Sequence, residues 1–218
     1  MNQSEILCRI DHTLLQADCR WQQIQRTYRL AEHFGAACAC IPPTFVERCR
    51  AQFAHLTLCT VIGFPLGYHT AAVKAEEARQ AIAGGADEID LVVNLGDVKD
   101  SRWQQVEQEL RLVRAAAGAH ILKVIVEACY LTREEKIRLC RLIGETGADY
   151  IKTSTGFGSG GAVLEDVALF RQHLADGVKI KAAGGIRTLA QAQAFLQAGC
   201  ERIGSSAILA ALAEKEGL

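Results

Sequence analysis

Two lysines lie in consecutive apolar segments of the sequence, and their spacing suggests amine chemistry. Lys152 lies in the segment Tyr150–Gly156, and Lys181 lies in Lys179–Gly185. A lysine attacks a carbonyl carbon only when its pKa falls far enough to supply the neutral amine. A second ammonium nearby lowers that pKa, so two lysines held on adjacent strands would leave one as a nucleophile. The spacing does not tell which of the two it is.

Asp90 supplies a carboxylate that could move a proton for such a lysine, directly or through water. It lies in Glu88–Asn94, where alternation places Glu88 and Asp90 on one strand face. Charged side chains inside a barrel are costly unless paired, so Asp90 and the two lysines together favour a site. The alternative is a structural ion pair with Lys123. Lys179, at the start of its strand, is expected to be solvated.

Glycines follow three of the expected strands and indicate a phosphate site. The candidates are Gly156, Gly184, Gly185, Gly204 and Ser205. The last two precede a helical run at Ala207–Leu212. In barrels, the loops after the seventh and eighth strands and the start of a short final helix often bind phosphate through backbone N–H groups. Tight turns would explain any one of these glycines, but their joint position favours phosphate.

These residues need parallel strands to bring them together, and the sequence predicts eight. The expected strands are Ile10–Leu15, Ala37–Ile41, Leu56–Phe64, Glu88–Asn94, His120–Glu127, Tyr150–Thr155, Val178–Ala183 and Arg202–Ser205. Amphipathic helical segments lie between them, among them Ala71–Ala83, Arg102–Ala116, Arg133–Glu145 and Leu189–Gln197. Strands alternating with helices, with no linker to mark a boundary, predict an α/β fold: a single (β/α)8 TIM barrel over residues 1–218.

A weak internal repeat supports the barrel. Three segments share a helix-ending glycine, a short polar turn and a strand: Gly85–Asp90, Gly147–Lys152 and Gly199–Gly204. The sixth position holds Asp90, Lys152 and Gly204, so these residues should lie at equivalent depths in three strands. The apolar residues between the inward ones should face the helices.

Composition narrows the classes of protein. The formal net charge is -1 and no basic stripe is present, so a nucleic-acid partner is not expected. No apolar run reaches about 18 residues, and the polar opening lacks a leader pattern, so we expect no membrane partner and a cytoplasmic location. The nine cysteines are scattered through apolar segments and are expected to be reduced. Cys38 and Cys40 share a strand face, but a metal pair would need a second pair of ligands.

The segments that carry this chemistry resemble the deoxyribose-phosphate aldolase family, from near Ile10 to Ser206. The matching segments, in order, are Ile10–Leu15, Val61–Gly67, Glu88–Asn94, Leu122–Glu127, Ile151–Gly158, Lys181–Thr188 and Arg202–Ser206. The resemblance implies reversible cleavage of 2-deoxy-D-ribose 5-phosphate to acetaldehyde and D-glyceraldehyde 3-phosphate, in deoxyribonucleoside catabolism.

The resemblance also implies roles for individual residues. Lys152 matches the family's Schiff-base lysine, and Asp90 and Lys181 match its proton donor and acceptor groups. Asp11, Thr13 and Lys123 are expected to support them. No cofactor and no metal are implied, and the partners are a small phosphosugar and aldehydes. Barrels of this kind often form dimers, so a homodimer is a candidate assembly.

Three positions depart from the family's usual pattern: Gln16, Ala183 and Ala207. They lie beside the phosphate region or the entrance and bear on phosphate affinity rather than on the chemistry. Three alternatives stay open: an isomerase or decarboxylase on the same barrel without an imine, a metal-dependent aldolase, and a non-catalytic phosphosugar-binding barrel. Scattered histidines disfavour the second, and the retained Asp90, Lys152 and Lys181 disfavour the third.

Overall fold

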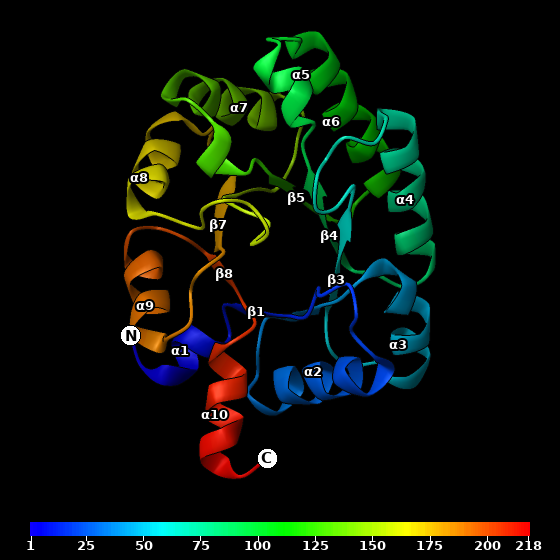
Figure 1. Cartoon of the computed structure of the whole chain (residues 1–218), viewed down its shortest axis with the longest axis vertical. Helices are drawn as coiled ribbons and strands as arrows, with labels where there is room; N and C mark the ends of the chain where they lie inside the picture. Colours follow the sequence, from blue (N-terminus) through cyan, green and yellow to red (C-terminus); the bar gives the residue numbers. More distant parts are fainter.

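The computed structural model describes residues 1–218 and contains a closed barrel of eight parallel strands in sequence order. Figure 1 shows the strands in the centre, enclosed by the helices. The strands are β1 (Ile10–Thr13), β2 (Cys38–Cys40), β3 (Leu58–Ile62), β4 (Glu88–Val92), β5 (Ile121–Ile125), β6 (Tyr150–Lys152), β7 (Lys179–Ala183) and β8 (Arg202–Ser205). The predicted (β/α)8 TIM barrel is confirmed.

At least one helix follows every strand, and one further helix, α1 (Gln3–Leu7), precedes β1. The others are α2 (Trp21–His33), α3 (Val46–Gln52), α4 (Ala71–Ala83), α5 (Leu95–Lys99), α6 (Trp103–Ala117), α7 (Arg133–Glu145), α8 (Leu164–His173), α9 (Leu189–Gln197) and α10 (Ile208–Glu216). Two short 3-10 turns, Pro43–Phe45 and Ala128–Tyr130, follow β2 and β5. The last helix extends outward from the ring and carries the C-terminus (Figure 1). No helix combines the length and the apolar character needed to cross a membrane.

The predicted elements are present with small shifts at their ends. Three predicted helices have the observed bounds, and the predicted Arg102–Ala116 begins and ends one residue later, as Trp103–Ala117. Seven strands are shorter than predicted, since the apolar alternation continues into the loops at their ends. Val93, for example, still donates a backbone hydrogen bond to Ile125 but lies beyond β4.

Local sequence signals account for the helix ends. Thr132 and Thr188 each form a capping box with the residue three positions later, Glu135 and Gln191. The repeat glycines Gly85, Gly147 and Gly199 have φ angles of 101°, 74° and 108°, a region that other residues rarely adopt. They end a helix and turn the chain into the next strand, as the repeat predicted.

The strand register arranges the inward side chains in layers. Asp90 pairs with Lys123 across β4 and β5, and Lys152 pairs with Lys181 across β6 and β7. In a barrel of tilted strands the level shifts by about one residue per strand, so each layer is built from alternate strands. From the amino-terminal end, the layers are Cys38, Glu88, Tyr150 and Arg202; then Asp11, Cys59, Lys123 and Lys181; then Cys40, Asp90, Lys152 and Gly204.

The third layer contains the sixth residue of each repeat segment, Asp90, Lys152 and Gly204. The strand register therefore places these three residues at the same depth in the barrel, as predicted. The outward residues Ile89, Leu91 and Val93 belong to the apolar core between barrel and helices, also as predicted. The interior of this barrel is therefore mostly charged and thiol groups, while the apolar core lies outside it.

Candidate active site

Asp90 is the centre of the charged interior. Its side chain is fully buried, and three lysine side chains donate to it. Lys123 Nζ lies 2.9 Å from Oδ1, while Lys152 Nζ and Lys181 Nζ lie 2.8 and 2.7 Å from Oδ2. Cys59 Sγ also lies 3.2 Å from Oδ1, the geometry of a thiol donating a hydrogen bond. The lysine pair and Lys123 were predicted as alternative partners of Asp90, and in the structure all three lysines contact it simultaneously.

The lysines fix the protonation state of this carboxyl. Burial alone would raise the pKa of Asp90, but Lys123, Lys152 and Lys181 outweigh it and hold that pKa well below its usual range. Asp90 is thus a carboxylate, able to accept a proton but not to donate one before the reaction begins.

Two further buried acids, Asp11 and Glu88, form ion pairs with these lysines and with Arg202. Asp11 Oδ2 lies 2.5 Å from Lys181 Nζ, and Asp11 Oδ1 lies 2.5 Å from the Arg202 guanidinium. Burial raises the pKa of Asp11, yet Lys181 and Arg202 bring it down to about 2. Glu88 contacts Lys123 at 2.6 Å and also pairs with Arg202. Asp11 and Lys123, which were predicted to support the site, contact Lys181 and Asp90 respectively, and their supporting role stays a prediction.

The two candidate lysines have different surroundings in the structure. Burial opposes the charge of Lys181, but Asp11 and Asp90 raise its pKa well above the usual value, so it stays an ammonium. Lys152 instead lines a cavity at the carboxyl-terminal end of the barrel. The simple expectation that two ammonium groups face each other was incomplete, because Asp90 Oδ2 accepts from both. Of the three lysines that contact Asp90, Lys152 alone lines the cavity.

The cavity has a volume of about 300 Å³ and is lined by all five predicted phosphate residues. Gly156, Gly184 and Gly185 have φ angles of 88°, 88° and 80°, which point to glycine-specific turns. A Cβ on Gly161 would lie 2.3 Å from the carbonyl oxygen of Gly184, so the loop after β6 packs directly on the loop after β7. Thr13, Gln16 and Ala183 also line the cavity, whereas Ala207 does not.

The predicted site residues did not include three polar residues of this cavity, Thr155, Arg187 and Ser206. Arg187 follows the glycine pair in the loop after β7 and is the one arginine of the lining. Its position after Gly184 and Gly185 was the available signal. Ser206 follows Ser205, whose own hydroxyl donates to Ile186 O at 2.8 Å and is therefore already engaged.

The loop after β6 is held by Glu127, the last residue of the predicted strand His120–Glu127. In the structure Glu127 lies beyond β5 with a φ angle of 48°, in the left-handed region. Its carboxylate accepts from the backbone N–H of Thr155 at 3.1 Å and from the Thr155 hydroxyl. It therefore shapes the cavity wall and does not join the lysine cluster.

The side chains of Lys179, His12, His69 and all nine cysteines lie outside the cavity lining. Lys179 is exposed, as expected for a solvated strand end. All nine cysteines are free thiols. His12 is buried, while His69 is exposed and takes no part in the cavity lining.

The fold and site together define a (β/α)8-barrel enzyme with an amine-rich centre beneath a polar, glycine-lined cavity. The chain belongs to the DeoC/LacD family of aldolases, whose model matches residues 6–213. It is 46% identical over 217 residues to a deoxyribose-phosphate aldolase of Clostridium botulinum, covering 99% of this chain and 98% of that protein. It is 48% identical over 210 residues to a deoxyribose-phosphate aldolase of Streptococcus pyogenes, covering 96% and 94%.

Among solved structures, the chain is similar to deoxyribose phosphate aldolase from Aeropyrum pernix. The TM-score is 0.87 at 29% identity, and the match covers 100% of this chain and 94% of that one. That structure is described as a tetramer.

Proposed function

We propose that this chain is a Schiff-base aldolase that cleaves 2-deoxy-D-ribose 5-phosphate reversibly to acetaldehyde and D-glyceraldehyde 3-phosphate. The observation that carries the proposal is the position of Lys152. Lys152 lies in the cavity wall, and its Nζ is 2.8 Å from a carboxylate that also accepts from the ammonium group of Lys181. The family and the relatives named above support the same reaction.

The first step is attack of the Lys152 amine on the aldehyde carbon, followed by loss of water to give a protonated imine. The imine accepts the electron pair when the bond between carbons 2 and 3 breaks. In this scheme Asp90 and Lys181, directly or through water, take the proton from the carbon-3 hydroxyl and later return one to the enamine carbon. Asp90 suits the acceptor role because it is ionised, and Lys181 suits the donor role because it is protonated.

The phosphate is proposed to bind at the glycine-lined end of the cavity. Gly156, Gly184, Gly185, Gly204 and Ser205 offer backbone N–H groups, and α10 begins just beyond. Arg187 adds a permanent positive charge at the same cavity. Binding energy from this remote group would orient the bond to be broken.

Borohydride trapping tests the proposal. The full chain is incubated with acetaldehyde or deoxyribose 5-phosphate, reduced with borohydride, and analysed by intact and peptide mass spectrometry. We expect a single reduced adduct on Lys152 in the native chain. The matched control Lys179→Ala, which removes an exposed lysine of the neighbouring strand, should keep the adduct, whereas Lys152→Ala should lose it.

A folded chain that forms no adduct on any lysine would refute the imine mechanism and favour an isomerase, a decarboxylase or a binding protein on the same barrel. If the chain cleaves the sugar without forming an adduct and a chelator abolishes this activity, the metal-dependent aldolase is favoured.

The remaining expectations stay predictions of this proposal. They are that residues 1–218 act as one domain, that the reaction needs no cofactor, and that the protein works in the cytoplasm without a nucleic-acid or membrane partner. A tetramer is a second candidate assembly beside the homodimer, because the structure of the Aeropyrum pernix relative is described as tetrameric. Light scattering of the purified chain would decide between the two assemblies.

A further inference from the structure

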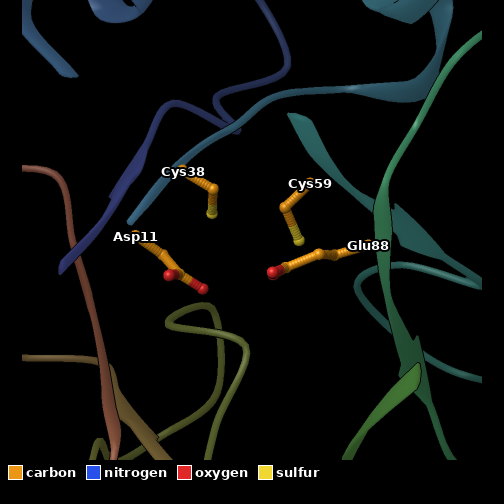
Figure 2. Close-up of side chains that lie close together, drawn as sticks. All are labelled: Asp11, Cys38, Cys59 and Glu88. Carbon is orange, nitrogen blue, oxygen red and sulfur yellow. The ribbon is translucent and has the colours of Figure 1, made fainter. Parts of the chain in front are cut away.

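Four side chains converge inside the barrel on the side away from Lys152. Figure 2 shows Asp11 and Cys38 pointing toward Cys59 and Glu88, with sulfur and oxygen atoms at the centre of the group. The four come from the consecutive strands β1, β2, β3 and β4. Their donor atoms all lie within 4.8 Å of one another, and all four residues are buried. None of them lines the active-site cavity.

This donor set has the composition of a zinc-type site. Sequence analysis dismissed a metal pair at Cys38 and Cys40 because a second pair of ligands was missing. The structure pairs Cys38 with Cys59 instead and supplies Asp11 and Glu88 as the second pair. Zinc bonds of about 2.3 Å to sulfur and about 2.0–2.2 Å to oxygen would need only a modest inward rotation of these side chains. Two thiols select thiophilic ions over calcium or magnesium.

Two of the oxygens in this group lack a well-formed hydrogen bond. Asp11 Oδ2 and Glu88 Oε2 are buried and accept none of acceptable geometry, although Lys181 Nζ and Lys123 Nζ lie 2.5 and 2.6 Å away. Figure 2 shows oxygens of both carboxylates turned toward the two sulfur atoms, so a cation bound there would replace the ammonium groups as the partner of Asp11 and Glu88.

The charge of the interior would not change on binding. The cluster holds the carboxylates of Asp11, Glu88 and Asp90 against Lys123, Lys152, Lys181 and Arg202. A divalent ion that displaces the protons of two thiols adds no net charge, because the two thiolates offset it. The second thiol group, Cys40 with Cys59 and Asp90, offers only three donors and includes Asp90 of the active site.

We infer that Asp11, Cys38, Cys59 and Glu88 form an inhibitory site for a thiophilic divalent ion, with Zn²⁺ or Cd²⁺ as ligand. Binding breaks two S–H bonds, forms two metal–sulfur bonds and releases two protons to solvent. It also draws Asp11 away from Lys181 and Glu88 away from Lys123, so both ammonium groups are left to Asp90. The binding stands independently of the proposed function, and only the inhibition rests on it.

Binding is tested with the reduced, metal-stripped full chain, using Cd²⁺ as a spectroscopic probe and Zn²⁺ in equilibrium dialysis, both in the presence of a phosphine reductant. The native chain should bind a single ion with a cadmium–thiolate absorption band and with proton release. Cys38→Ala, which removes a ligand without touching Asp90, should weaken binding by more than about tenfold. The matched control Cys140→Ser, a buried thiol of α7 outside the barrel, should bind as the native chain does.

Absence of the thiolate band in the native chain, or equal binding by Cys38→Ala and the native chain, would overturn the site. If Cys38→Ala does not fold, Cys38→Ser tests the same ligand with a smaller change in volume. Mass spectrometry after rapid alkylation gives a second measurement, since Zn²⁺ should protect Cys38 and Cys59 but not Cys140.

Inhibition is measured separately as loss of aldol cleavage on addition of Zn²⁺ and its recovery with a chelator. Inhibition that Cys38→Ala relieves supports the link to Lys181. Binding without loss of activity overturns the inhibitory role. A chain that binds Cd²⁺ but never cleaves the sugar speaks against the proposed function and not against the metal site.

Discussion

His12 makes the stability of the barrel depend on pH in a way that can be worked out from its surroundings. The side chain lies on β1 beside β8, where it is 4% exposed and its Nδ1 has no hydrogen-bond partner. Burial lowers the pKa of His12 from 6.5 to about 4, partly offset by a backbone contact with Ser205. The neutral ring is therefore the form that the folded protein prefers.

The sign and the size of the effect follow from this difference. Below pH 6.5 the unfolded chain takes up a proton at His12 that the folded chain refuses, so stability falls as the pH drops from 6.5 toward 4. The difference of about 2.5 pKa units corresponds to about 3 kcal/mol by pH 4. Above pH 6.5 the contribution is constant.

Urea unfolding at several pH values measures this dependence. We compare the native chain with His12→Asn, which cannot take up the proton, and follow the difference in unfolding free energy rather than either value alone. Acidic groups common to both chains cancel in that difference. A difference that stays constant from pH 7 to pH 4 would refute the account of His12 as a buried, neutral ring.

Three further predictions concern the site. Asp90→Asn should lower kcat for deoxyribose 5-phosphate cleavage by about 10²–10⁴-fold through loss of the proton acceptor, measured by coupled assay, and unchanged kcat would exclude that role. Arg187→Ala should lower kcat/KM for the phosphorylated sugar by about ten- to a hundredfold, as expected for a lost charged contact of about 1.5–3 kcal/mol. Unphosphorylated deoxyribose should show no such loss, and an equal loss for both sugars would place Arg187 outside the phosphate site. Asp11→Asn should destabilise the chain by about 3–5 kcal/mol in urea unfolding, because Lys181 and Arg202 lose a buried partner. A loss below about 1 kcal/mol would show that the two cations are balanced without it.

The sequence was sufficient to predict the eight strands and to place Asp90 and the lysines on the inward faces of their strands. Alternation along Glu88–Asn94 correctly separated the inward Asp90 from the outward Ile89 and Leu91. The helix-ending glycines marked the start of three strands, and the repeat placed Asp90 and Lys152 at one depth. These signals are local, so one segment at a time is enough to read them.

Contacts that depend on barrel closure could not be predicted in this way. Asp11 and Arg202 pair across β1 and β8, which become neighbours only when the ends of the sheet meet. The convergence of Cys38 with Cys59 depends on the stagger between strands, and the orientation of Arg187 toward the cavity depends on the loop after β7. None of these leaves a periodic signal in the sequence.

Gly204 gives the third layer of the barrel a special property. Its companions Cys40, Asp90 and Lys152 each extend a side chain inward, while Gly204 contributes none. A Cβ there would lie 2.9 Å from the Ala183 side chain and 3.5 Å from Lys181 Cε. The space beside Gly204 is therefore occupied by the side chains of two β7 residues, Ala183 and Lys181, and the absence of a Cβ lets them approach β8 closely. A larger residue at position 204 would displace these side chains and so disturb the lysine that donates to Asp90.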